Sequence, residues 1–272
     1  VPFSEVGIEK HCELVEDPKE AELFYCGQFN DMEGSLILPN VFEHFTGNEE
    51  RHVFDIEGDE GMIGWNMPHY LTKCIYTAMN ASPDHRNMNV FVRPGCSMLL
   101  KNMIAVPRSN PPTPKRGFYF RGQRDIYGTR VKVKEAFEKA DVPGVFEFTA
   151  KWHCPTPASD PEVRIYEEGM TEWEFALCPA GYGQSTQRYY EAVLLARTPV
   201  IIADNLTFED GWTSPLRMSA GASVDQLARW FRMIFDGGDV DPKGINIARL
   251  IQIYFADPTL YFINWMKSRG IV

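Results

Sequence analysis

The chain has 272 residues, of which 44% are hydrophobic, and this is enough material for one large or two small domains. Its 27 basic and 37 acidic residues give a formal net charge of −10, which argues against nucleic acid or an anionic membrane as the main partner. No apolar run approaches the roughly 20 residues of a membrane span, and no signal peptide is visible. We therefore expect a soluble, cytoplasmic protein, and the start at Val1 is compatible with removal of an upstream segment.

The first part of the chain alternates apolar runs with polar connections, which is typical of an α/β layer. Strands are predicted at 21–26, 52–56, 89–92 and 102–106. A helix is predicted at 69–79, where five apolar residues share one helical face. A proline-rich, basic stretch at 108–117 predicts a stiff, extended connection. We accordingly place a first domain at 1–110 and a second at 111–255.

Beyond this connection the alternation of strands and helices resumes. A strand at 117–120, a helix at 129–140, a strand at 144–148 and a short helix at 166–173 precede a unit that spans 175–204. Helices are then predicted at 225–235, 244–255 and 258–267. This order indicates an α/β fold of two doubly wound domains. The aromatic-rich C-terminal helices are expected to pack back on the first domain, with 256–272 returning to it.

Residues 175–204 form the clearest pattern, a βαβ unit with a glycine loop. The run FALC predicts a buried strand, and Ser185 or Thr186 caps the following helix. Such a helix N-terminus favours a phosphate, because its free N–H groups and its dipole attract anions. Arg188 adds a positive charge, and Glu191 is placed to accept hydrogen bonds from a ribose. GYGQS is neither GxGxxG nor a P-loop, and glycine and proline are also ordinary turn residues, so both interpretations stay open.

The motifs of the second domain resemble those of a known family. F-x-L-C-P-x-G-Y-G, R-x-x-E-A and T-P-V-I-I-x-D, together with RGFYFRGQRDIYGTR, are similar to the signature of the exostosin-like glycosyltransferases. The resemblance extends over 20–235 and implies two Rossmann-like domains that face each other across a cleft, the GT-B arrangement. It also implies inverting transfer of a sugar from a UDP-sugar to a saccharide or glycan acceptor, with no metal and no further cofactor. UDP-xylose is the donor that we favour.

The resemblance and the local chemistry together assign a set of site residues. The donor-binding residues are expected to be Arg121, Gly122, Arg124, Arg130, Tyr182, Gly183, Gln184, Ser185, Arg188 and Glu191. Inverting transfer also needs a base that removes the acceptor proton, and this base is expected from strand ends of the first domain. We assign Asp59, in the loop beyond the strand at 52–56, and name Asp31 as the runner-up.

Two other functions remain as alternatives. Asp239 and Asp241 match the D-x-D motif of metal-dependent glycosyltransferases, but Asp241 precedes Pro242 in a pattern typical of a helix cap. The six cysteines lack CxxC pairs, so we expect reduced thiols and no metal site. The second alternative is a non-catalytic carbohydrate-binding module, since 13% of the residues are aromatic.

Overall fold

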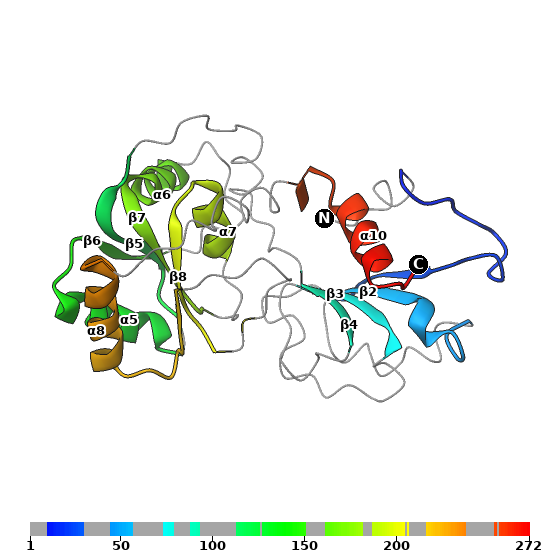
Figure 1. The fold of residues 1–272 in the computed structure, drawn as a ribbon, viewed down its shortest axis with the longest axis horizontal. Helices are drawn as coiled ribbons and strands as arrows, with labels where there is room; N and C mark the ends of the chain where they lie inside the picture. The colour runs from blue at the N-terminus through cyan, green and yellow to red at the C-terminus, as the bar shows by residue number, and fades with distance from the viewer. Residues whose placement is uncertain are drawn as a thin grey trace. The chain divides into compact units, whose positions relative to one another are not determined.

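The fold was analysed in a computed structural model (Figure 1). It describes residues 10–29, 44–56, 73–78, 88–92, 113–125, 127–150, 161–181, 187–204, 206, 216–237, 253–254 and 256–272. The chain divides into two compact units, each of which contains a parallel sheet. Unit 1 comprises Val1–Arg93, Asn205–Glu209 and Ala256–Val272, and unit 2 comprises Pro94–Asp204 and Asp210–Phe255. The predicted α/β class is therefore confirmed.

Unit 1 holds a four-stranded sheet in the order β1-β2-β3-β4, in which every neighbouring pair is parallel. Its strands are β1 (Phe24–Phe29), β2 (His52–Ile56), β3 (Ile75–Ala78) and β4 (Asn89–Val92). The strands predicted at 52–56 and 89–92 are confirmed, and the strand predicted at 21–26 lies at 24–29. The segment at 102–106 lies outside the described residues. Every residue of β2 and β3 is buried, as expected of strands covered on both faces.

The helix predicted at 69–79 is wrong in its described part, because this segment contains β3. Ile75 to Ala78 pair in register with β2 on one side and with β4 on the other. The apolar residues fit a helical face, but they also form the continuous run Cys74–Ile75–Tyr76, which suits a buried strand equally well. Pairing with two neighbouring strands then decides between the two structures, since local propensity is only a weak prior.

A C-terminal helix, α10 (Pro258–Ser268), completes unit 1. The ring of Phe91 on β4 lies 5.6 Å from that of Phe262 and 5.3 Å from that of Trp265. Asp257 caps the helix by accepting a hydrogen bond from the backbone N–H of Leu260. The helix predicted at 258–267 is therefore confirmed, and aromatic contacts attach it to the sheet of the first 93 residues.

Unit 2 holds a five-stranded sheet in the order β6-β5-β7-β8-β9, again with parallel pairs throughout. Its strands are β5 (Lys115–Gln123), β6 (Gly144–Thr149), β7 (Trp173–Pro179), β8 (Thr198–Ile202) and β9 (Arg217–Met218). Its helices are α5 (Thr129–Ala140), α6 (Pro161–Glu172), α7 (Gln187–Leu194) and α8 (Val224–Phe235). In chain order the strands run 2-1-3-4-5, which is one of the two common doubly wound orders.

Helices cover both faces of this sheet (Figure 1). Phe118, Phe175 and other apolar strand residues pack with α5 and α8 in one core cluster. On the opposite face, Tyr119 contacts Tyr166 of α6, and a Cβ on Gly169 of α6 would overlap the Tyr119 ring. Helix α5 begins and ends where the sequence predicts, and α8 starts one residue before its prediction with a capping box from Ser223. Most of the helix predicted at 244–255 lies outside the described residues.

Candidate functional site

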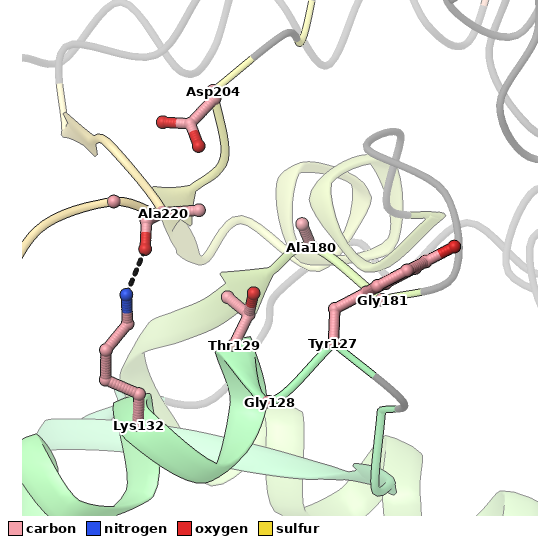
Figure 2. Close-up of a pocket in the computed structure, with 9 residues that line it drawn as sticks. Tyr127, Gly128, Thr129, Lys132, Ala180, Gly181, Asp204 and Ala220 are labelled. Carbon is pink, nitrogen blue, oxygen red and sulfur yellow. Dashed lines mark hydrogen bonds between the residues drawn. The ribbon is translucent and has the colours of Figure 1, made fainter.

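The topology of unit 2 identifies the edge of the sheet where a ligand is expected. From β5 the chain crosses to β6 on one side, whereas from β7 it crosses to β8 on the other. Neighbouring loops therefore diverge at the carboxyl ends of β5 and β7, and ligands of doubly wound folds bind at such a switch point. A pocket of about 340 Å³ lies at this edge (Figure 2). It is lined by Tyr127, Gly128, Thr129, Lys132, Ala180, Gly181, Asp204, Ala220 and Gly221.

Glycines from three strand-to-helix connections line the pocket. Gly128 precedes α5 with a φ of 77°, a left-handed conformation that favours glycine. Gly181 follows β7, and Gly221 lies between β9 and α8. Without side chains, these residues allow a ligand to approach the backbone closely. At Gly181 the space is already occupied, since an added Cβ would overlap Nη2 of Arg130.

The polar side chains of the pocket come from the ends of strands and from the first turn of α5. Nζ of Lys132 donates a hydrogen bond to the backbone carbonyl of Ala220, as Figure 2 shows. Asp204 follows β8, and its carboxylate accepts a hydrogen bond from the hydroxyl of Ser219. Tyr127 is 61% exposed and lines the pocket together with Gly181 (Figure 2). The pocket therefore offers an aromatic ring, a cation and an anion.

A carboxylate of the protein itself occupies the N-terminus of α5. Asp125 accepts hydrogen bonds from the backbone N–H groups of Thr129, at 2.7 Å, and Arg130, at 3.0 Å. The first N–H groups of a helix are those that bind phosphate in other doubly wound folds. Here two of them already face a negative charge, which disfavours a second anion at the same place.

Arg188, predicted to contact a phosphate, lies at the carboxyl end of β5 with only 9% of its surface exposed. Its Nη2 donates to the backbone carbonyl of Arg121 at 2.9 Å. Its guanidinium lies 4.5 Å from the ring centroid of Phe120 and 5.7 Å from that of Tyr166. Burial by itself lowers the pKa of Arg188, but Tyr166, Cys178 and Glu191 outweigh it and raise the pKa, so the side chain is charged.

Glu191, predicted to hold a ribose, is 5% exposed and accepts a hydrogen bond from the hydroxyl of Tyr166 at 2.6 Å. Burial, followed by the negative charge of Glu191, raises the pKa of Tyr166 well above its usual range. We call Tyr166, Arg188 and Glu191 the buried polar cluster. Tyr166 is not among the predicted site residues, because nothing in the sequence pattern of a short helix shows which residue faces a buried charge.

The other predicted donor-binding residues that the structure describes lie near the carboxyl end of β5. Arg121 pairs with Glu147 and, at 2.5 Å, with Glu162. The guanidinium of Arg124 lies 6.0 Å from the ring centroid of Phe148. Nη1 of Arg130 donates to the backbone carbonyl of Gln123 at 2.7 Å. A Cβ on Gly122 would lie 2.7 Å from Nη2 of Arg188, so glycine leaves room for that guanidinium.

Several predicted residues lie outside the described part of the chain. They are Asp31, Asp59, Tyr182, Gly183, Gln184, Ser185, Asp239 and Asp241. Near the predicted base, the structure does describe Asp55 of β2, which is fully buried and accepts a hydrogen bond from the hydroxyl of Thr77 on β3. This pair places a carboxylate and a hydroxyl on neighbouring strands of unit 1, close to their carboxyl ends.

The pocket residues Tyr127, Lys132 and Asp204 are not among the predicted site residues. A signal for them existed, because Asp204 directly follows a predicted strand and Tyr127 closely precedes a predicted helix. In the described residues, no group of three or more His, Cys, Asp or Glu side chains is placed to hold a metal ion. Within the described ranges, no helix has the length and apolar composition needed to cross a membrane. Comparison with family models and with curated proteins finds no match.

Proposed function

We propose that the protein is an inverting glycosyltransferase that moves a sugar from a nucleotide diphosphate sugar to a saccharide hydroxyl. The observation that carries this proposal is the glycine-lined pocket at the switch point of a doubly wound sheet. Nucleotides are common ligands at this position of the fold. The resemblance of the motifs at 116–204 to exostosin-like glycosyltransferases narrows the proposal from nucleotide binding to sugar transfer.

The arginines near the pocket support a site for a diphosphate leaving group. Arg130 lies against Gly181, where the predicted phosphate loop begins, and Arg124 follows β5 at the same edge. Positive charges at fixed positions stabilise the charge that develops on a departing diphosphate, and this requires no metal ion. Arg188 contributes from inside the domain in this proposal, because it is hydrogen-bonded to the end of β5.

The proposal assigns the acceptor and the catalytic base to unit 1. In a single displacement, a base removes the proton of the acceptor hydroxyl while that oxygen attacks the anomeric carbon. We retain Asp59 as this base and Asp31 as the runner-up, both from strand-end loops of the first domain. The GT-B arrangement of two facing domains belongs to the same proposal, as does the expected cytoplasmic location.

A donor screen tests the proposed function. The wild-type protein is incubated with UDP-xylose, UDP-galactose, UDP-glucuronic acid, UDP-N-acetylglucosamine or UDP-arabinose, and release of UDP is measured with and without saccharide acceptors. We expect turnover with one donor, with UDP-xylose favoured, and we expect UDP to raise the melting temperature through ligand linkage. Absence of UDP release with every donor, together with an unchanged melting temperature in millimolar UDP, GDP and TDP, would contradict the proposal.

A further inference from the structure

We infer that the pocket between α5 and the loop before α8 binds the nucleoside of the donor, and that Asp204 rather than Glu191 holds the ribose. This inference rests on the proposed function for the identity of the rest of the ligand. The charges, the exposure and the hydrogen bonds of the residues that line the pocket determine which part of a nucleotide each of them can contact.

The charges that line the pocket disfavour a phosphate. Asp125 already accepts the N–H groups of Thr129 and Arg130, so the N-terminus of α5 faces a carboxylate. The ammonium of Lys132 donates to a backbone carbonyl, and the same pocket also contains the carboxylate of Asp204. A diphosphate would therefore enter a site with little net positive charge. An uncharged group does not meet this repulsion.

The same residues suit a base and a ribose. The exposed ring of Tyr127 offers a flat surface on which a base can stack, and stacking of bases on aromatic side chains tolerates different bases. Gly128, where an added Cβ would meet nothing within 4 Å, leaves the backbone open to close approach. A carboxylate has several acceptor positions, so Asp204 can accept from ribose hydroxyls in addition to Ser219.

The position of Glu191 explains why the ribose is assigned to Asp204. The carboxylate of Glu191 is buried and accepts a hydrogen bond from Tyr166, whereas Asp204 is exposed at the end of β8. A ribose could reach Glu191 only after the buried polar cluster is rearranged. The diphosphate is then expected outside the pocket, towards Arg130, whose guanidinium lies against Gly181.

Calorimetric titration of the full chain with nucleosides tests the inference. Uridine, guanosine, thymidine and adenosine are titrated into wild-type protein, and the nucleoside that binds is then titrated into variants. Tyr127→Ala and Asp204→Asn should each weaken its binding about tenfold, whereas Tyr127→Phe, which keeps the ring, should bind within about twofold of wild type. Asp236→Asn is the matched control, because this exposed residue lies at the opposite end of α8.

Three results would overturn the inference. The first is that no nucleoside binds at millimolar concentration, and the second is that Tyr127→Ala and Asp204→Asn bind the nucleoside as tightly as Asp236→Asn does. The third is a loss of nucleoside binding in Glu191→Gln that exceeds the loss in Asp204→Asn. The donor screen decides the proposed function separately, since UDP release by the wild-type protein does not depend on which residue holds the ribose. Nucleoside binding that Tyr127→Ala and Asp204→Asn weaken would support the inference. The proposed function would still be contradicted if no donor released UDP and UDP, GDP and TDP left the melting temperature unchanged.

Discussion

Nη2 of Arg188 donates a hydrogen bond to the backbone carbonyl of Arg121 at 2.9 Å, so a side chain of α7 holds the carboxyl end of β5. The contact joins the two sides of the switch point, because α7 follows β7 while Arg121 belongs to β5. A second contact joins the helix that follows β5 to the chain that follows β7. In it, Arg130 of α5 lies against Gly181. The chain at or just beyond the carboxyl end of each of these two strands is thus contacted by an arginine from the helix that follows the other strand.

Removal of the Arg188 side chain should destabilise the protein strongly. Arg188→Ala would leave the buried carboxylate of Glu191 without its neighbouring positive charge, and loss of one partner from a buried charged cluster costs about 3 to 5 kcal/mol. Urea denaturation measures this change in the free energy of unfolding. Arg229→Ala, on the exposed side of α8, is the matched control and should have little effect. Equal stabilities of the two variants would contradict a structural role for the Arg188 charge.

Two glycines should differ in their tolerance of alanine. Gly144 has a φ of 149°, and a Cβ there would overlap the backbone of Phe118, so Gly144→Ala should cost about 3 kcal/mol. At Gly122 the added Cβ meets only the end of the Arg188 side chain, which can move. Gly122→Ala should therefore cost less, about 1 kcal/mol. The midpoints of urea denaturation compare the two variants, and a larger loss in Gly122→Ala would mean that the guanidinium of Arg188 cannot shift.

The stability of unit 1 should depend on pH through Asp257. The hydrogen bond from Lys10, assisted by the backbone N–H of Leu260 and by His11, lowers the pKa of Asp257 to about 2. Since the pKa is lower in the folded state, this carboxylate stabilises the fold above its unfolded pKa of about 3.9. The contribution is lost as the pH falls towards about 2.

Unfolding of wild type and Asp257→Asn at several pH values measures this contribution. Wild type should be the more stable protein near neutral pH, and the difference should shrink as the pH falls below about 4. Thermal unfolding followed by circular dichroism is sufficient for the comparison. If the difference in stability does not change with pH, the interactions of Asp257 in the folded state do not involve its charge.

Native cysteines should differ sharply in reactivity. Burial raises the pKa of Cys74 and Cys178 to about 12, and it does the same for Cys26 with a smaller effect from neighbouring Cys74. Because the thiolate is the reactive form, these three should resist iodoacetamide near pH 8. Cys12 is exposed and should be alkylated before these three. Peptide mapping by mass spectrometry measures each rate, and labelling of Cys178 as fast as Cys12 would mean that unit 2 opens readily.

The predicted base gives a test that is independent of the donor site. Asp59→Asn should retain UDP binding and lose turnover, because the amide cannot take up the acceptor proton. Binding is followed by the shift in melting temperature, and turnover by release of UDP in the presence of acceptor. Unchanged turnover in Asp59→Asn, combined with a loss in Asp31→Asn, would transfer the role of base to the loop after the first strand.

Most strands and helices of unit 2 could be predicted because their patterns admit one interpretation. The segments at 144–148 and 175–178 are short apolar runs bounded by turn residues, and 129–140 has a helical period and no internal breaker. The segment around Ile75 fits two patterns at once. Only its pairing with β2 and β4, which depends on distant parts of the chain, makes it a strand.

The site was harder to predict, because side-chain direction depends on packing between elements. The sequence places Arg121 and Arg188 near strand ends, but it does not show that Arg121 faces two glutamates or that Arg188 points into the domain. These contacts come from α6 and β6, which the sequence cannot orient. Tyr127 and Asp204 could have been predicted, because residues that follow the carboxyl ends of parallel strands lie at the same edge of the sheet.

Because α10 packs on Phe91, unit 1 cannot be completed during translation until the C-terminal segment has been made. All of unit 2 lies between the first 93 residues and the segment at 256–272 that finishes unit 1. As the ribosome makes the chain from its N-terminus, all the strands and helices that the structure describes in unit 2 are synthesised before Phe262 and Trp265. Unit 1 therefore begins first and is finished last. Until α10 is made, Phe91 lacks its contacts with the rings of Tyr261, Phe262 and Trp265.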